Sequence, residues 1–156
     1  MREILFRGKQ VNNGEWVYGF YCHYDDIEDN GKDDCDYIVE KHNGDHFPFV
    51  KVTPETVSQY TGLTDKNGKK IFEGDILKYT RKNWHEPLSS QNGTDLIGFL
   101  EIYYDDTCAT FKYKHYDENC KLLGSGFLLL EDSRAEENII EIIGNVYDNP
   151  ELLEER

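Results

Sequence analysis

Hydrophobic and polar positions alternate along short stretches of this chain, which is the side-chain period of a β-strand. Over residues 16–24, the face that carries Trp16, Tyr18 and Phe20 alternates with the face that carries Val17. Five Asn-Gly dipeptides mark tight turns, because this pair tolerates the positive φ angles of short hairpin loops; they begin at Asn13, Asn30, Asn43, Asn67 and Asn92. The pattern predicts a mainly β fold, a meander of antiparallel hairpins with little helix.

The expected strands follow from these turns. We expect 4–10 to pair with 16–24, 37–40 with 47–52, and 96–104 with 108–114, and we expect 127–130 to form a further strand. Residues 135–146 have isoleucines at helical spacing, but their β-branched side chains and Gly144 lower helix propensity, so a strand is favoured.

Residues 53–77, TPETVSQYTGLTDKNGKKIFEGDIL, combine a helix start with two turns. Thr53 and Pro54 suit an N-cap and a first helical position, which predicts a short helix over 54–60. Val57 and Tyr60 would form its buried stripe, and Gly62 would end it. Residues 65–69 and 73–75 read as tight turns before a strand from Ile76 to Tyr79. A second run of N-cap residue, proline and acidic residue occurs at Asn149, Pro150 and Glu151. It predicts a helical tail over 150–155.

Three stretches of this sequence resemble one protein family. They are the opening MREILFRG, the central QYTGLTDKNGKKIFEGDIL and the ending IEIIGNVYDNPELLEE at 140–155, and they occur in the order found in the YopX family of small bacteriophage and prophage proteins. The resemblance implies a phage-encoded cytoplasmic protein with an SH3-like β-barrel and no established activity. Residues 25–36 and 84–93 depart from the family pattern and look like insertions.

The domain organisation expected from this resemblance is one YopX-type domain over 1–156. It could subdivide into an N-terminal β-hairpin region at 1–52, an SH3-like barrel at 53–148 and a helical tail at 149–156. A chain of 156 residues that is 38% hydrophobic and 13% aromatic can bury its own core.

The net charge of the chain argues against two classes of binding partner. The chain has 31 acidic and 17 basic residues, a net charge of −14, which repels nucleic acid phosphate and anionic membrane. We therefore expect no direct nucleic acid binding and no membrane binding. No apolar stretch approaches the ~20 residues of a spanning helix, and residues 1–8 do not resemble a signal peptide. We expect the protein in the bacterial host cytoplasm, with its four cysteines as free thiols and the sequon at Asn92 as a turn only.

Residues 25–36 are rich in acidic side chains and resemble part of a calcium-binding loop. Its residues at positions one, three, five, six and nine of an EF-hand loop would be Asp26, Glu28, Asn30, Gly31 and Asp34. The twelfth position, which needs a bidentate acid, is Tyr37, and the flanks read as strands where helices are required. A solvated acidic hairpin loop is the simpler interpretation.

Zinc is a second candidate, because cysteines and histidines gather in one third of the chain. They are Cys22, His23, Cys35, His42 and His46, and their spacings match no zinc signature. Cys22 and His23 are neighbours on a strand and should point to opposite faces. Buried thiols and surface histidines explain them more simply, so we predict no metal and no other cofactor.

Catalytic motifs are also lacking. Gly124-Ser125-Gly126 has the wrong glycine spacing for a nucleophile elbow, and no phosphate-binding loop occurs. We assign no catalytic residue, and an enzyme is disfavoured.

Two classes of function stay open. The first is a non-enzymatic interaction or regulatory module, whose acidic field would steer it to a basic surface on a host or phage protein. The second is a small-molecule or nucleotide enzyme with a pocket at the barrel mouth. Eleven tyrosines on an edge-rich β protein also predict homo-oligomerisation. Speculative partner contacts lie in the two departing segments: Asp25, Asp26, Glu28, Asp33, Asp34, Trp84 and His85.

Overall fold

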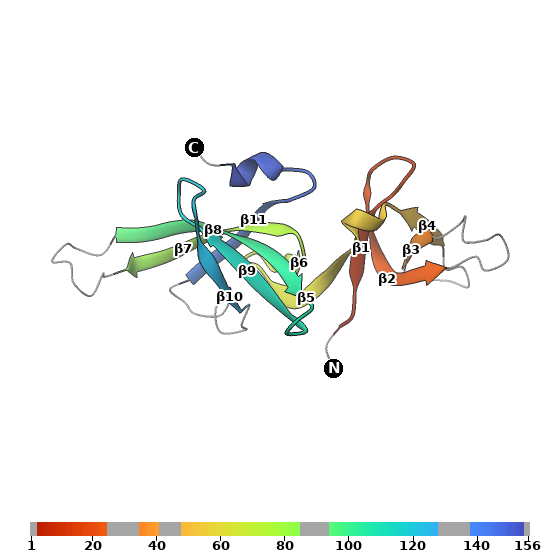
Figure 1. Cartoon of the computed structure of the whole chain (residues 1–156), viewed down its shortest axis with the longest axis horizontal. Coiled ribbons are helices and arrows are strands. Elements are labelled where there is room, and N and C mark those ends of the chain that lie inside the picture. Colours follow the sequence, from red (N-terminus) through yellow and green to blue (C-terminus); the bar gives the residue numbers. More distant parts are fainter. Residues whose placement is uncertain (1–2, 25–34, 41–47, 85–93, 128–137, 155–156) are drawn as a thin grey trace. The chain divides into compact units, whose positions relative to one another are not determined.

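The computed structural model describes residues 3–24, 35–40, 48–84, 94–127 and 138–154 (Figure 1). Antiparallel β-sheet dominates these residues and helix is minimal, which confirms the predicted mainly β class. The chain divides into two compact units, Met1–Gly62 and Leu63–Arg156. Among the described residues, no helix has the length and apolar character that crossing a membrane would demand.

The first unit contains four strands, one helical turn and most of a fifth strand. They are β1 (Phe6–Lys9), β2 (Trp16–Tyr24), β3 (Cys35–Glu40), β4 (Phe49–Val52), η1 (Pro54–Thr56) and β5 (Ser58–Thr64). The sheet has the order β4-β3-β2-β1-β5-β6, with β6 at Lys70–Phe72. The β1–β2 and β3–β4 pairings confirm two of the predicted hairpins.

The core of the first unit lies on one face of this sheet. Val17, Ile38 and Val52 are at most 2% exposed there. β4 also returns to the end of β1, since the Thr53 N–H donates to the Lys9 carbonyl at 2.8 Å. An isolated bridge between Gln10 and Val52 accompanies this bond, so the buried side chains are enclosed by β1 to β4.

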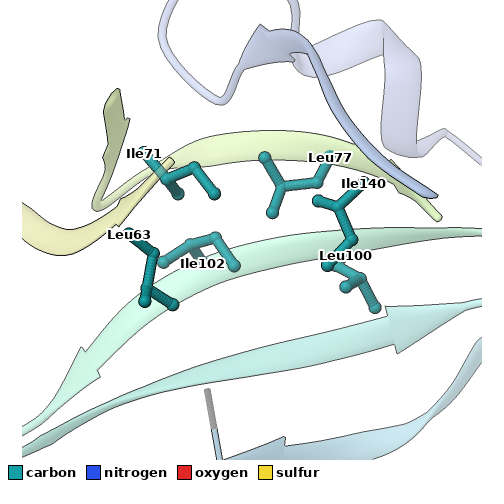
Figure 2. Close-up of a cluster of buried hydrophobic side chains, with 6 residues drawn as sticks. All are labelled: Leu63, Ile71, Leu77, Leu100, Ile102 and Ile140. Atoms are coloured by element: carbon teal, nitrogen blue, oxygen red, sulfur yellow. The ribbon is translucent and has the colours of Figure 1, made fainter. Parts of the chain in front are cut away.

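The second unit is built on a five-stranded antiparallel sheet with the order β10-β9-β8-β7-β11. Its elements are β7 (Asp75–Trp84), β8 (Thr94–Asp105), β9 (Thr110–Tyr116), β10 (Leu122–Phe127), β11 (Asn138–Asn145) and η2 (Pro150–Leu153). Figure 2 shows the core side chains, which come from β5, β6, β7, β8 and β11: Leu63, Ile71, Leu77, Leu100, Ile102 and Ile140. The sheet ends in β10 and β11, so the predicted SH3-like barrel is not closed.

The predicted helix over 54–60 is shorter than expected. It is a single 3₁₀ turn, Pro54–Thr56, and the Thr53 side chain makes no capping hydrogen bond. The reason is long-range pairing: the Lys9 N–H of β1 donates to Thr56 Oγ1 at 2.9 Å, and β5 begins two residues later beside β1. Tyr60 is therefore buried from a strand, and Gly62 lies within that strand instead of ending a helix.

The turn and strand predictions that rest on local chemistry are confirmed. The Asp65 N–H donates to the Lys69 carbonyl at 2.8 Å, and Gly68 has a φ of +78°. Gly74, between β6 and β7, has a φ of +76°. β8 pairs with β9 as predicted, and β11 confirms the strand interpretation of 135–146. The helical tail is a 3₁₀ turn, Pro150–Leu153.

The strand expected at 127–130 meets the described structure only at Phe127, which is the last described residue of a strand. The strand is Leu122–Phe127, and residues 128–130 lie outside the described part of the chain. Its sequence, LLGSGF, lacks the alternation that locates a strand, and a register shift between Leu122 and Gly124 interrupts the pairing with β9. The Gly-Ser-Gly segment lies within this irregular strand.

Candidate interaction surface

The register of the first sheet places large aromatic side chains together on the face opposite the core. Residues directly opposite each other in antiparallel strands share a face. Phe20 of β2 is opposite Val39 of β3, which is opposite Phe49 of β4, so these three side chains form one row across the sheet. We call this surface the aromatic face, and its aromatic residues are Tyr18, Phe20, Tyr24, Tyr37 and Phe49.

Most of the aromatic face is open to solvent. The exposed fractions are 47% for Tyr18, 56% for Phe20, 59% for Tyr24 and 63% for Phe49. The Tyr37 and Phe49 rings make an edge contact with centroids 6.3 Å apart. A single exposed aromatic residue is ordinary, but a contiguous group on one sheet face is typical of an interaction site.

Charge on the aromatic face differs from that of the whole chain. Arg7 is opposite Tyr18, Lys9 opposite Trp16 and Lys51 opposite Tyr37, so the charged residues at the described positions of this face are cations. Arg7 is buried, at 5% exposed. The Arg7 guanidinium lies 4.5 Å from the centroid of the Trp16 ring, and Lys9 Nζ lies 5.5 Å from it. These cation–π contacts hold Trp16 at the border of the face.

The opposite face carries the acids of β3. Asp36 Oδ1 accepts from the Tyr21 hydroxyl at 2.6 Å and lies 2.8 Å from His23 Nδ1. Burial raises the pKa of Asp36, but the hydrogen bonds from Tyr21 and His23 outweigh it and the net pKa is lowered. Asp36 therefore stays ionised and joins β2 to β3, and a protonated His23 would strengthen the contact.

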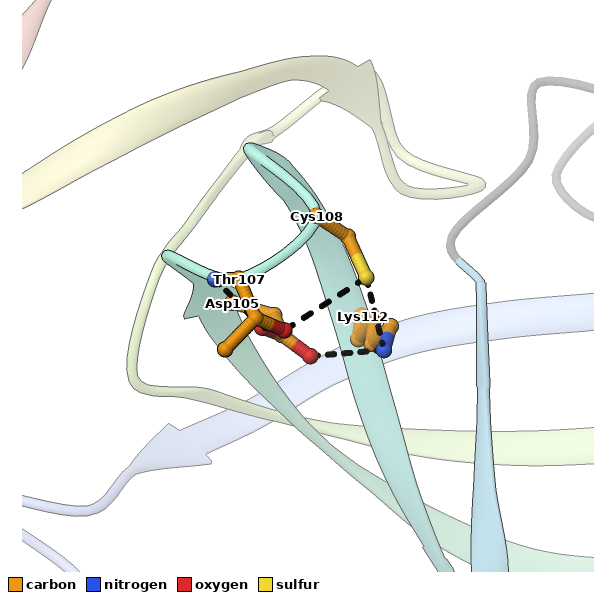
Figure 3. A network of polar contacts seen from close by, with 4 residues as sticks. All are labelled: Asp105, Thr107, Cys108 and Lys112. Carbon is orange, nitrogen blue, oxygen red and sulfur yellow. Dashed lines mark hydrogen bonds and ion pairs between the residues drawn. The ribbon is translucent and has the colours of Figure 1, made fainter.

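A second polar cluster lies in the turn between β8 and β9 (Figure 3). Lys112 Nζ is 2.6 Å from Asp105 Oδ2, and the Thr107 N–H donates to Asp105 Oδ1 at 2.9 Å. Hydrogen bonds from Lys112 and Thr107 lower the pKa of Asp105 to about 2. Cys108 Sγ lies 3.6 Å from Lys112 Nζ. The cluster fastens both ends of the turn, and this structural role accounts for its contacts.

A third cluster lies further along β8 and β9. Glu101 accepts from Lys114 Nζ at 2.7 Å and from the Tyr116 hydroxyl at 2.7 Å. Burial, and then the hydrogen bond to Glu101, raise the pKa of Tyr116, so this hydroxyl stays a proton donor to the carboxylate. The residues bridge neighbouring strands and are accounted for by that role.

The structure leaves the predicted contact residues of the two departing segments untested. Asp25, Asp26, Glu28, Asp33, Asp34 and His85 lie outside the described residues, and so do the calcium positions within 25–34. Trp84 is the last residue of β7 and pairs with Thr94, but only its backbone is described. A role for these residues stays a prediction.

Among the zinc candidates, Cys22 and Cys35 lie on the same face of the first sheet, and His23 lies on the other. Cys22 lies opposite Tyr37 and His23 opposite Asp36, which places them on different faces, as predicted for neighbours on a strand. His42 and His46 lie outside the described residues. Within the described part of the chain, no three histidine, cysteine or acidic residues are grouped as metal ligands.

Sequence reasoning found the alternation of β2 but did not select its exposed face as a site. The signal was present, because Trp16, Tyr18 and Phe20 share one face in the sequence pattern. The buried face of β2 is the one that packs with Ile38 of β3 and Val52 of β4, so residues outside β2 decide it.

Comparison with known proteins supports the resemblance in the sequence. The YopX family profile, described as YopX protein, matches residues 5–154. The chain belongs to the YopX family. No curated protein matches it. The crystal structure of protein EF1440 from Enterococcus faecalis is similar to this YopX chain, with 24% identity, coverage of 99% of this chain and 100% of that one, and a TM-score of 0.45.

Proposed function

We propose that this YopX protein is a non-enzymatic interaction module of a phage or prophage, which binds a protein partner in the bacterial cytoplasm through its aromatic face. The observation that carries the proposal is the exposed row of Phe20 and Phe49 with Tyr18 beside it. Aromatic residues and arginine are enriched at the centres of protein interfaces, where a few of them supply most of the affinity.

In this proposal the net charge of the chain and its aromatic face act at different stages of binding. A net charge of −14 would attract a partner with a basic surface over long range and raise the association rate. The aromatic face would then supply short-range contact, because removal of large apolar surface from water favours the complex. Lys9 and Lys51, at the margin of the face, would select acidic groups on the partner's contact surface.

The thiol groups support the proposed compartment. Cys22, Cys35, Cys108 and Cys120 are all free in the structure. A reducing cytoplasm keeps such thiols unpaired.

The partner can be found by crosslinking from the face itself. A photoreactive phenylalanine analogue at position 20 should capture a bacterial protein that the same analogue at position 127 does not. Phe127 is a matched control, because it is 53% exposed and belongs to the second unit.

The captured protein then allows a quantitative test. The double variant Phe20→Ser, Phe49→Ser should weaken binding of the purified partner by roughly 30-fold or more, the effect of losing a hot spot of about 2 kcal/mol. Phe127→Ser should bind normally. Calorimetry measures both, and circular dichroism shows that each variant is folded. Unchanged affinity of the double variant would refute the aromatic face as the binding site.

A further inference from the structure

The two edge strands of the five-stranded sheet in the second unit, β10 and β11, differ in the hydrogen bonds made on their outer sides. β11 is covered along part of its outer side by the turn that follows β5. The Lys66 N–H donates to the Ile140 carbonyl at 2.9 Å, and the Ile142 N–H donates to Asp65 Oδ2 at 3.3 Å. These bonds satisfy backbone groups that would otherwise be open to another strand.

β10 forms the other edge and pairs with β9 on one side. Among the described residues, no hydrogen bond to its other side is found. An open row of backbone donors and acceptors is a template for a further strand, and natural proteins usually protect it with charged residues or proline. β10 reads LLGSGF and has neither. One irregularity, between Leu122 and Gly124, protects only its beginning.

The side chains of β10 add apolar surface to this open edge. Leu122, Leu123 and Phe127 are 55%, 58% and 53% exposed. From Ser125 to Phe127 the strand is in regular register with β9, opposite Lys114, Tyr113 and Lys112. An added strand could therefore pair with the regular half while the apolar side chains at both ends pack against it.

Charge indicates what kind of strand can approach. A chain with net charge −14 repels its own copies over most of its surface. β10 has no charged side chain. The neighbouring strand β9 carries Lys112 and Lys114, which form ion pairs with Asp105 and Glu101 of β8. The described residues of β10 therefore carry no charge that would repel a second copy. An antiparallel pairing of two identical edges is also self-complementary, because each copy supplies the groups that the other requires.

We propose that β10 is a homodimerisation edge: β10 of one copy pairs antiparallel with β10 of a second copy, and the two five-stranded sheets join into one continuous sheet. β10 belongs to the second unit, whereas the aromatic face belongs to the first.

The wild-type mass gives the first test. In sedimentation equilibrium, the mass should rise with concentration and approach twice 18.3 kDa at about 100 µM. Hydrogen exchange of the amides at 122–127 should slow over the same concentration range. A mass that stays at 18.3 kDa overturns the proposal, and so does protection of these amides that is independent of concentration, because the occupant of the edge would then belong to the same chain.

Substitutions in β10 test whether this strand forms the dimer interface. Leu123→Lys with Phe127→Lys puts like charges at the edge and should weaken the dimer by at least about tenfold. Phe20→Lys, at a residue of similar exposure on the aromatic face, should leave it unchanged. A dimer that survives the double lysine variant, or that dissociates with Phe20→Lys, contradicts the proposal. Circular dichroism confirms that each variant is folded, and Leu123→Gln with Phe127→Gln provides an uncharged second variant that should weaken the dimer less.

Discussion

At the scale of single residues, the Asp105–Lys112 pair allows a direct test of the electrostatics. Lys112→Gln removes the strongest cause of the lowered pKa of Asp105, so this pKa should rise from about 2 toward the ordinary value of 3.8. Titration of the Asp105 side-chain carboxyl by NMR measures the shift. Lys114→Gln, on the same strand, is the control and should leave the pKa of Asp105 unchanged, because its partner is Glu101.

The same pair sets the sign of a pH dependence. Asp105 has a lower pKa in the folded protein, so its stabilising effect is fully present above pH 3.8 and is lost as the pH falls toward about 2. The Lys112→Gln variant should show less of this acid-dependent loss. Equal loss in the variant and the wild type between these pH values would show that Asp105 is not held by Lys112.

At the scale of elements, Asp65 links the turn after β5 to the edge of β11. Its carboxylate accepts from the Asn67 and Lys69 N–H groups at 2.8 and 2.9 Å, and from the Ile142 N–H. Asp65→Ala should lower the free energy of unfolding by about 3 kcal/mol, because three partly buried N–H groups lose a charged acceptor. Urea unfolding measures the loss.

A matched control separates this effect from the loss of any acid in a turn. Asp106 is exposed in the turn between β8 and β9, and Asp106→Ala should change the unfolding free energy by less than about 0.5 kcal/mol. If both variants unfold at the same urea concentration, Asp65 does not hold the turn to β11.

Elements governed by local chemistry were the ones the sequence could locate. Asn67 and Gly68 require a turn whatever surrounds them, and that turn is present. The helix over 54–60 was too long because its second half pairs with β1, a partner about fifty residues away in the chain. Residues 122–126 of β10 were missed because their glycines remove the alternating pattern that marks a strand.

The candidate site was harder to predict than the strands that build it. Alternation in β2 gave two faces, but only the arrival of Ile38 and Val52 decides which of them is buried. The exposed aromatic residues could then be identified as a surface. Their position on one exposed face is visible only when the strands are compared with one another, which a pattern within one strand does not allow.

At the scale of the whole molecule, the excess of acidic residues should control the response to salt. Surface ion pairs such as Lys66–Glu141 have side chains about 40% exposed and contribute roughly 0 to 1 kcal/mol each. Two like charges 10 Å apart in water repel by about 0.4 kcal/mol, and each surplus acid of a chain with net charge −14 has several such neighbours. Screening should therefore remove more repulsion than attraction.

We expect the melting temperature at pH 7.5 to rise by several degrees between about 10 mM and 300 mM sodium chloride, as the Debye length shortens from roughly 30 Å to below 10 Å. The same series near pH 4.7, the isoelectric point, is the control, because little net repulsion is left to screen there and the rise should largely disappear. Differential scanning calorimetry measures both series at fixed protein concentration, which removes any contribution from dimerisation. A melting temperature that falls with salt at pH 7.5 would mean that the ion pairs outweigh the repulsion, and the acidic surplus would then lie too dispersed to generate the steering field assigned to it.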